Sequence, residues 1–503
     1  MEAFTPDTIC ALASAEGTAA LGIIRLSGPN AHNIAQKIFF PKHPRKAPLP
    51  PSLPQSWPSK QVLFGSIRDG ETLIDEVLLH TAKAPASFTG EDTVEINCHG
   101  STYIQQEILR LLVREGARPA LAGEFSQRAF LQGKMDLTQA EAVADLIASE
   151  NEAAHRLALQ QMRGGVSQEI ASLRRELLDF ASLMELELDF SEEDVNFADR
   201  HRLLGLLDAA VLHISSLCTS FQWGNALKNG VPVAIIGSTN AGKSTLLNAL
   251  LGEERAIVSE QHGTTRDTIE ECLSLDGIRF RFIDTAGLRD TIEEIEMLGI
   301  ARSYEKIHSA SLLLLLLDIN HPEQFYQSLA KVLPEIDTNR QQLVVIFNKS
   351  EKYIEQNADC NNIVSSNNNS VTNIHNINID SYISAFLDSL ANQGLPLQSV
   401  IAISAKYRLG LDALKDALLQ SFRQRMGHFA QGATLLTNTR HLHALEQALA
   451  ALDNVRQGLE SDIPTDLITQ DLRLALYHLG SITGEIATEE ILGNIFGKFC
   501  VGK

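Results

Sequence analysis

The residues with the clearest chemistry form a loop of the kind that binds phosphate. Residues 237–244 read GSTNAGKS, and they lie between an apolar segment, 233–236, and a predicted helix that continues to Leu250. In such a loop the backbone N–H groups and the helix N-terminus face the phosphates, Lys243 reaches the β and γ oxygens, and Ser244 is a ligand for Mg²⁺. Strand, loop and helix in this order predict a nucleoside triphosphate site.

Further motifs follow in the order expected of a GTPase. Thr265, within GTTRD at 263–267, is expected to complete the Mg²⁺ shell when a γ-phosphate is bound. In DTAG at 284–287, Asp284 is expected to hold a Mg²⁺-bound water, and the Gly287 N–H is expected to face the γ-phosphate. The motifs NKSE at 348–351 and SAK at 404–406 each follow an apolar segment, and they are predicted to bind guanine.

Two positions depart from the usual GTPase pattern. Glu351 stands where Asp is usual, and its longer side chain can still accept two hydrogen bonds from guanine, so guanine is expected over adenine. Leu288 stands where small GTPases have the Gln that orients the attacking water, and leucine cannot form that hydrogen bond. Asn240 is therefore a candidate ligand for a monovalent cation beside the phosphates. The alternative is that Asn240 only stabilises the loop.

Length and composition indicate a soluble protein of several domains. The chain has 503 residues, enough for about three domains, with 44% apolar and 21% charged residues. No Lys or Arg occurs in residues 1–20, so neither a secretory signal nor a transit peptide is expected, which favours the cytoplasm and no membrane contact. The longest apolar run, 312–317, is far shorter than the roughly 20 residues that cross a bilayer, and it suits a buried strand.

Charge and cysteine spacing exclude other classes of protein. The formal net charge of −20 argues against a protein that coats nucleic acid, so any RNA contact is expected to be local or shared with a partner. The six cysteines, at 10, 98, 218, 272, 360 and 500, are far apart and form no C-x-x-C pair, which argues against a zinc site or a disulfide framework.

The segments predict a multidomain α/β chain. Residues 1–121 are expected to form an N-terminal α+β domain, and residues 122–228 and 424–503 the two parts of an all-α helical domain, because apolar residues recur there at helical spacing. Between these parts, residues 229–423 alternate strands and helices, which predicts an inserted Ras-like, doubly wound α/β GTPase domain. Residues 355–380 are rich in Asn and are expected to be a surface insertion without function.

Beyond the nucleotide motifs, several segments carry a resemblance to a known family. They are GIIRLSG at 22–28, FTGED at 88–92, CHG at 98–100, GEFSQRAFL at 123–131, KMDL at 134–137 and FCVGK at 499–503. With them the chain resembles the bacterial tRNA-modification GTPases of the MnmE family, also called TrmE. The resemblance extends over nearly the whole chain except for a proline-rich loop and the Asn-rich insertion.

The resemblance implies a function and partners. Members of the family work as homodimers with the flavoprotein GidA, also called MnmG, which carries FAD, in a heterotetramer or larger complex. Together they place an aminomethyl or carboxymethylaminomethyl group on C5 of the wobble uridine of certain tRNAs. The one-carbon unit comes from a formyl- or methylene-tetrahydrofolate, and GTP hydrolysis depends on K⁺ and Mg²⁺.

The resemblance also implies site residues beyond the motifs above. The folate site falls on Arg25, Glu95, Lys134 and Lys503, each of which would otherwise be an ordinary surface charge. Glu296 is implied as the residue that orients the attacking water. The implied K⁺ ligands are Asn240, Ser259 and Gln261, close to Thr264. Cys500 is either a nucleophile or redox-active thiol in tRNA modification, or a structural cysteine; the sequence leaves both open.

The complete expected site combines the motifs with the resemblance. The expected catalytic residues are Glu296, Lys243, Thr265 and Gly287, and the expected Mg²⁺ ligands are Ser244 and Thr265. The expected GTP-binding residues are Asn240, Ala241, Gly242, Lys243, Ser244, Thr245, Ser259, Glu260, Gln261, His262, Gly263, Thr264, Thr265, Asp284, Thr285, Ala286, Gly287, Asn348, Lys349, Glu351, Ser404, Ala405 and Lys406.

Two alternative functions are a ribosome-assembly GTPase of the Era or Der kind and a scaffold that binds nucleotide without turnover. The first predicts a KH-like G-x-x-G or a second phosphate loop, and neither occurs. The intact motifs argue against the second.

Overall fold

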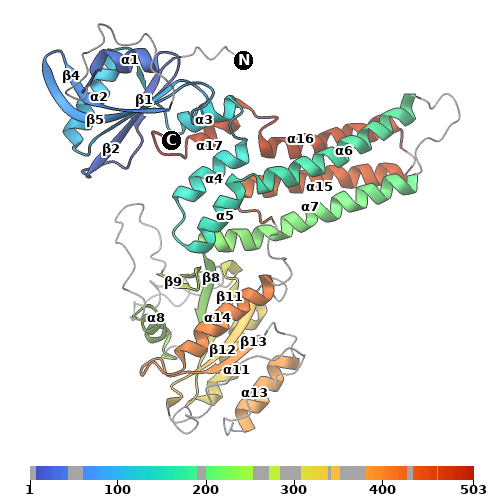
Figure 1. Ribbon diagram of the computed structural model, residues 1–503. Coiled ribbons are helices and arrows are strands. Elements are labelled where there is room, and N and C mark those ends of the chain that lie inside the picture. Colours follow the sequence, from blue (N-terminus) through green and yellow to red (C-terminus); the bar gives the residue numbers. More distant parts are fainter. Residues whose placement is uncertain are drawn as a thin grey trace. The chain divides into compact units, whose positions relative to one another are not determined.

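The computed structural model describes residues 7–42, 60–189, 200–238, 240–252, 271–283, 308–337, 341–351, 381–392, 395, 397–426, 434–461 and 463–503 (Figure 1). The chain forms two compact units. The first contains Met1–Ala148, Ala158–Ser215 and Arg440–Lys503, and the second contains Ser149–Leu157 and Ser216–Thr439. The predicted domain boundaries at 121, 228 and 423 stay predictions. The Asn-rich segment 355–380 lies outside the described residues.

The first unit begins with a seven-stranded sheet in the order β3-β4-β5-β6-β2-β1-β7. Its strands are β1 (Ile9–Leu12), β2 (Leu21–Ser27), β3 (Phe39–Pro41), β4 (Gln61–Asp69), β5 (Thr72–Ala82), β6 (Thr93–His99) and β7 (Arg118–Pro119). Neighbours are antiparallel except for the parallel pair β1–β7. Two helices, α1 (Ala31–Ile38) and α2 (Thr102–Arg114), supply Ile34 and Ile108 to a core shared with Ile24 and Ile96 of the sheet. The helices therefore cover one face, and side chains that alternate with the core residues lie on the other face.

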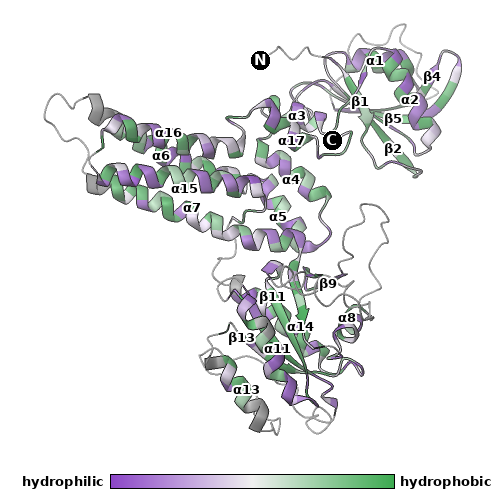
Figure 2. Ribbon diagram, turned by 180° about the vertical axis from the view of Figure 1, so that it is seen from behind, coloured by the Kyte–Doolittle hydropathy of each residue, from purple (hydrophilic) through white to green (hydrophobic). Residues whose placement is uncertain are grey.

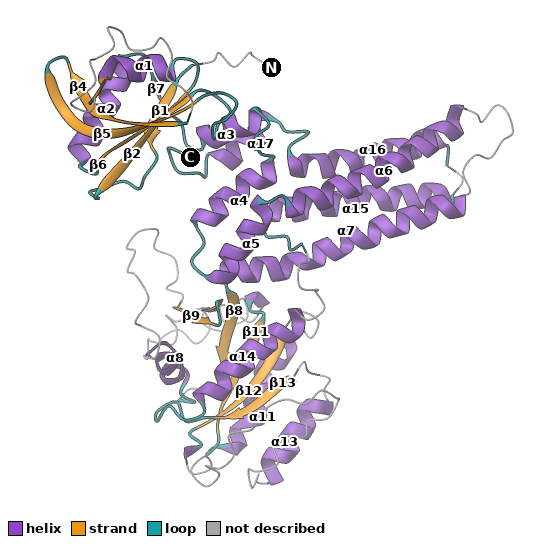
Figure 3. Cartoon of the chain, in the orientation of Figure 1, coloured by secondary structure: helices purple, strands orange, loops and turns teal. Residues whose placement is uncertain are grey.

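The rest of the first unit is helical (Figure 3). The helices described here are α3 (Glu124–Leu131), α4 (Leu137–Ile147), α5 (Glu152–Met162), α6 (Gly165–Asp189), α7 (Arg200–Asn229), α15 (Thr439–Glu460), α16 (Thr465–Thr483) and α17 (Glu489–Phe496). Residues 152–157 of α5 and 216–229 of α7 belong to the second unit. Helix α16 packs along α6 and against α4. Asp136 caps α4 with its side chain and forms a capping box with Gln139. The long helices predicted from the apolar spacing are present.

A buried ion cluster ties α4 to α15. Glu141 accepts a hydrogen bond from Arg440 Nε at 2.9 Å, and its other carboxylate oxygen lies 2.7 Å from His441 Nε2. Burial alone would raise the pKa of Glu141, but the charges and hydrogen bonds of His441 and Arg440 outweigh it and lower the pKa to about 2. Arg440 also donates to Ser481 O and Ile482 O near the end of α16. The cluster thus fixes three helices at the point where the chain enters α15.

Helix α7 contains a segment that the sequence analysis overlooked. Leu203–Asn229 is long and apolar enough to cross a membrane by length and composition, and an 18-residue window within it has a mean hydropathy of 1.5. A core helix of a soluble protein meets the same criteria. By contrast, the predicted buried strand at 312–317 is confirmed, because every residue of β11 (Leu312–Asp318) is buried.

The second unit is built on a six-stranded sheet in the order β13-β12-β11-β8-β10-β9. The strands besides β11 are β8 (Val231–Ile236), β9 (Glu271–Leu275), β10 (Ile278–Phe282), β12 (Gln342–Asn348) and β13 (Leu397–Ala402). All neighbours are parallel except β9 and β10. In the described part of 230–426 the helices are α8 (Lys243–Gly252), α11 (Phe325–Val332), α13 (Ser381–Asn392) and α14 (Leu411–Met426), with short 3₁₀ turns at Pro322–Gln324 and Leu333–Glu335.

The leucines of β11 show why this sheet is doubly wound. Leu314 and its neighbours two residues away pack in one core with α8 and α14. Leu315 and its neighbours two residues away pack in a second core with α11 and α13. Because side chains alternate along a strand, a strand covered by helices on both faces is apolar throughout. Figure 2 shows the central strands of this sheet as largely hydrophobic. The predicted fold class is confirmed.

Candidate functional site

The phosphate loop joins β8 to α8 and lies tightly against the neighbouring strands. A Cβ at Gly237 would lie 2.3 Å from Leu316 O, and a Cβ at Gly242, whose φ is +100°, would lie 2.3 Å from Asn348 Nδ2. Both positions therefore require glycine. Asn240 is exposed and has a φ of +66°, a left-handed conformation that Asn tolerates better than most residues.

Lys243 is the first residue of α8, and its side chain folds back over the phosphate loop. Its Nζ donates to Gly237 O at 2.8 Å and to Ser238 O at 3.0 Å. Burial lowers the pKa of Lys243 from its usual value, and an anion bound next to the ammonium group would favour the charged form. Ser244 and Thr245 follow in the first turn of α8, the end of a helix that favours anions.

Asn348 connects the phosphate loop to both predicted guanine loops. This residue is 2% exposed, and its Nδ2 donates to Ala241 O at 2.8 Å while its Oδ1 accepts from the Ala405 N–H at 3.0 Å. The Ser350 N–H also donates to Ile403 O at 3.0 Å. Three loops far apart in the sequence therefore meet at the carboxyl ends of β8, β12 and β13. In parallel α/β sheets this edge is where ligands bind.

Glu351 and Lys349 extend this site. Glu351 Oε1 accepts a hydrogen bond from Ser404 Oγ at 2.8 Å, which holds the longer carboxylate next to the SAK loop. Lys349 Nζ forms an ion pair with Asp318 Oδ2 at 2.7 Å, at the end of β11. Burial alone would raise the pKa of Asp318, but Lys349 and hydrogen bonds from Asn320 outweigh it and lower the pKa. Ser404 and Asp318 thus hold the two charged side chains of the NKSE motif in place.

Some of the expected nucleotide residues lie outside the described residues. They are Ser259, Glu260, Gln261, His262, Gly263, Thr264, Thr265, Asp284, Thr285, Ala286, Gly287 and Glu296, together with Leu288. Their expected roles in Mg²⁺ binding, K⁺ binding and catalysis stay predictions.

A second group of predicted residues meets on the open face of the seven-stranded sheet. Arg25 on β2 and Glu95 on β6 are direct cross-strand partners. Arg25 Nε and Nη2 each lie 2.8 Å from Glu95 Oε1, and Arg25 Nη1 donates to Gly502 O at 3.5 Å. On the other side, His80 Nδ1 lies 3.9 Å from Glu95 Oε2. Sequence reasoning missed His80, because only the register of β5 against β6 reveals that it faces Glu95.

The C-terminal motif docks beside Arg25. Val501 forms an antiparallel bridge with Ala122, and the Gly123 N–H donates to Cys500 O at 3.4 Å. Gly502 has a φ of +95°, and a Cβ there would lie 2.1 Å from Leu12 O. The glycine of the Cys-x-Gly-Lys motif is therefore required by the close approach of β1, and it brings the half-buried Lys503 to the same end of the sheet.

Cys500 differs from the buried thiols of this unit. It is exposed, whereas burial raises the pKa values of Cys10 and Cys98 to about 11. An exposed thiol is accessible to a reactant, and the expected role of Cys500 in tRNA modification stays a prediction.

Lys134 contacts the loop formed by residues 83–92. Its Nζ donates to Pro85 O at 2.8 Å. Gly90 in this loop has a φ of +81°, and a Cβ there would lie 3.0 Å from Gln132 Cβ. The same loop carries Phe88, whose ring lies over the Arg25 guanidinium. Arg25, Glu95 and the C-terminal segment thus come together directly, and Lys134 joins them through this loop.

Comparison with known proteins agrees with this architecture. The family model described as "GTP-binding protein TrmE N-terminus" matches residues 8–134, and the one described as "MnmE helical domain" matches residues 137–500. The chain belongs to the MnmE family of tRNA modification GTPases. It is therefore a GTP-binding enzyme that hydrolyses GTP in tRNA modification, and the resemblance noted in the sequence is confirmed.

Relatives of nearly equal length share almost half of their residues with this MnmE-family chain. A "tRNA modification GTPase MnmE" from Christiangramia forsetii is 46% identical over 99% of both chains. Proteins of the same name from Bacteroides fragilis and Parabacteroides distasonis are each 47% identical, covering 99% of this chain and 99% and 100% of their own. A solved GTP-binding protein from Sulfolobus solfataricus, in complex with GDP, is 18% identical and covers 50% of this chain and 67% of its own, with a TM-score of 0.26. That likeness is too slight to support a conclusion.

Proposed function

We propose that this GTPase depends on K⁺ and Mg²⁺ and works with the FAD-carrying partner GidA, or MnmG, to modify C5 of the wobble uridine of certain tRNAs. The group added is aminomethyl or carboxymethylaminomethyl, and its one-carbon unit comes from a formyl- or methylene-tetrahydrofolate. The proposed folate site rests mainly on one observation: Arg25, Glu95 and the C-terminal Gly502 meet on one face of a sheet.

The charges at this convergence suit a folate. A folate presents a glutamate tail, which cations bind, and a pterin edge, which a carboxylate can hold by hydrogen bonds. Arg25 uses Nε and Nη2 for Glu95, and a guanidinium has five N–H donors, so further donors are present for a ligand. Lys134 and Lys503 add positive charge from a neighbouring loop and from the C-terminus.

The proposed cation dependence rests on the phosphate loop. Arginine fingers raise the hydrolysis rate of other GTPases by about 10³–10⁵-fold, and a monovalent cation bound near Asn240 would supply comparable charge. The exposed side chain of Asn240 and its left-handed backbone are consistent with such a ligand. Ser244 at the start of α8 suits the proposed Mg²⁺ site, with Thr265 as the second expected ligand.

We also propose that this chain forms a homodimer, and an apolar area on the open face of the sheet supports this proposal. Phe64 on β4 and Leu78 on β5 are direct cross-strand partners, and they are 48% and 47% exposed. Val62, two residues before Phe64 and on the same face, is 63% exposed. Exposed apolar side chains that lie together on a sheet commonly mark an interface with another chain.

A complementation experiment tests the proposed function. In a strain that lacks this chain, nucleoside mass spectrometry of the tRNA should show loss of the wobble-uridine group, and the wild-type chain should restore it. Arg25→Ala should fail to restore the modification while its purified protein still hydrolyses GTP. The matched control is Arg110→Ala, since Arg110 is an exposed arginine on α2, and it should behave as wild type. Full restoration by Arg25→Ala would contradict the proposed folate site.

A further inference from the structure

Two aromatic rings enclose the guanidinium of Arg25. Arg25 Cζ lies 5.2 Å from the centroid of the Phe88 ring and 5.6 Å from that of the Phe125 ring. Phe88 belongs to the loop at 83–92 and is partly exposed, whereas Phe125 belongs to α3 and is fully buried. The orientation of Arg25 therefore depends on how this loop and this helix are placed relative to each other.

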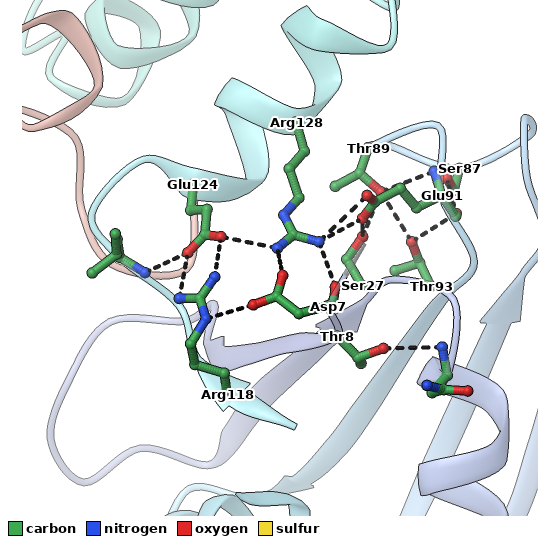
Figure 4. Close-up of polar contacts among 12 residues, drawn as sticks. Asp7, Thr8, Ser27, Ser87, Thr89, Glu91, Thr93, Arg118, Glu124 and Arg128 are labelled. Atoms are coloured by element: carbon green, nitrogen blue, oxygen red, sulfur yellow. Dashed lines mark hydrogen bonds and ion pairs between the residues drawn. The ribbon is translucent and has the colours of Figure 1, made fainter. Parts of the chain in front are cut away.

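Hydrogen bonds fix the loop next to Phe88. Thr89 Oγ1 lies 2.6 Å from Ser27 Oγ on β2, and the Ser27 hydroxyl also lies 2.8 Å from Glu91 Oε2. Ser87 Oγ donates to Glu91 O at 2.5 Å, within the same loop. Glu91 is thus the acidic residue through which the loop meets its neighbours (Figure 4).

A buried guanidinium joins this loop to α3. Arg128 is 1% exposed, and its Nη1 lies 3.3 and 3.2 Å from the two carboxylate oxygens of Glu91. Its Nη2 donates to Glu124 Oε1 at 2.9 Å and to Asp7 Oδ1 at 2.5 Å. Figure 4 shows Arg128 between Glu91 on one side and Glu124 and Asp7 on the other. Arg128 and Glu124 pair one turn apart on α3, the helix that also carries Phe125, so the contact of Arg128 with Glu91 connects this helix to the loop that carries Phe88.

We propose that Arg128 is a positioning residue for the tetrahydrofolate site, holding Phe88 and Phe125 against Arg25 through the bridge Glu91–Arg128–Glu124. This inference rests on the proposed function, because it assigns the bridge a role in binding the folate.

The chemistry of the bridge explains why it needs arginine. Three carboxylates, those of Asp7, Glu91 and Glu124, approach Arg128, and a planar guanidinium can donate to them in fixed directions with separate nitrogens. A lysine ammonium would keep the charge but has a single nitrogen on a flexible chain, so it cannot hold both sides of the bridge at once. Arg128→Lys should therefore loosen the bridge without removing the buried positive charge.

The test measures binding of 5-formyltetrahydrofolate to the full chain by isothermal titration calorimetry. Arg128→Lys and Glu91→Gln should each raise the Kd at least tenfold, with GTP hydrolysis unchanged. The matched control is Arg118→Lys. Arg118 pairs with Asp7 and Glu124 as Arg128 does, but the structure gives it no bond to Glu91, and its side chain is 41% exposed. The Kd of Arg118→Lys for 5-formyltetrahydrofolate should stay within threefold of the wild-type value.

A double-mutant cycle separates positioning from general stability. If Arg128 acts through Arg25, then Arg25→Lys combined with Arg128→Lys should bind no more weakly, within twofold, than Arg25→Lys alone. The inference would be overturned if the Kd of the double variant rose by the product of the two single effects. It would also be overturned if Arg128→Lys bound the folate with wild-type affinity. If Arg128→Lys does not fold, judged by circular dichroism, Glu91→Gln carries the same test. Failure of the wild-type chain to bind would instead refute the folate site, and the inference would fall with it.

Discussion

Replacing Gly502 by alanine should displace the C-terminal motif while the two folded units stay intact. A Cβ at this position would lie 2.1 Å from Leu12 O and 2.9 Å from Leu12 C, and both atoms belong to the backbone of β1. The φ of +95° is also unfavourable for alanine, since left-handed conformations cost roughly 1–2 kcal/mol in residues with a Cβ. The contact and the backbone strain both oppose docking of the segment.

Several interactions among the described residues hold the C-terminal residues 500–503. They include the bridge between Ala122 and Val501, the 3.4 Å bond from the Gly123 N–H to Cys500 O and the 3.5 Å bond from Arg25 to Gly502 O. Bonds of this length are at the weak end of the usual net range of about 0.5–1.5 kcal/mol. A penalty of about 2 kcal/mol lowers the ratio of docked to undocked segment by about thirtyfold.

Two assays report this change. Hydrogen exchange at the Gly123 amide, which donates to Cys500 O, should speed up by at least tenfold in Gly502→Ala, and wobble-uridine modification should fall by a similar factor. GTP hydrolysis should not change, because the nucleotide loops belong to the second unit. The control is Gly493→Ala in α17, where a Cβ would meet nothing within 4 Å. Unchanged exchange and full modification in Gly502→Ala would refute this reasoning.

Further substitutions test the nucleotide site and the helical core. GTP hydrolysis by the wild-type chain, measured by phosphate release, should be at least about tenfold faster in K⁺ than in Na⁺ at equal ionic strength, and Asn240→Ala should remove this difference. In the same assay Glu296→Ala should lower turnover by about two orders of magnitude. Glu351→Ala should raise the Kd for GDP, measured by calorimetry, by about thirtyfold, because the variant loses charge-assisted hydrogen bonds to guanine that are worth about 2 kcal/mol. The pKa of Glu141 is lowered to about 2 from an ordinary value of 4.5, so its stabilising effect is complete above pH 4.5 and is lost as pH falls from 4.5 to 2. Thermal unfolding across this range should show less pH dependence in Glu141→Gln than in wild type.

Each of these expectations has a clear counter-result. Equal rates in K⁺ and Na⁺ for the wild-type chain would refute the cation mechanism, and normal turnover in Glu296→Ala would remove its assigned role. Unchanged GDP affinity in Glu351→Ala would mean that this carboxylate does not form hydrogen bonds with guanine. A wild-type unfolding curve that does not vary below pH 4.5 would contradict the ion cluster around Glu141.

Local patterns in the sequence predicted the fold class, because they follow from what each segment must bury. The unbroken leucines of β11 signal a strand covered on both faces, and the structure places alternate leucines in two cores. The phosphate loop is likewise recognisable from its strand, glycines and helix. The apolar length of α7 was missed, because its hydrophobic residues are spread among polar ones and form no continuous run.

Contacts between distant segments could not be predicted in the same way. Arg25 and Glu95 are 70 residues apart, and only the register of β2 on β6 makes them partners. Arg128 lies within a recognised motif, but nothing local indicates that its guanidinium is buried against Glu91 or Asp7. Asn348 was predicted to bind guanine, whereas its bonds to Ala241 and Ala405 depend on the arrangement of three strands.

Reconstituted tRNA modification tests the central claim most directly. The purified chain would be incubated with the proposed flavoprotein partner, unmodified tRNA, GTP, K⁺, Mg²⁺, methylene-tetrahydrofolate and an amine, either ammonium or glycine, that supplies the nitrogen of the added group. The wobble nucleoside would then be analysed by mass spectrometry. A modified uridine should form with the wild-type chain, and none should form when GTP or the folate is omitted or when Lys243→Ala replaces the wild type. An unmodified wobble uridine in the complete mixture, despite continued release of phosphate from GTP, would contradict the claim.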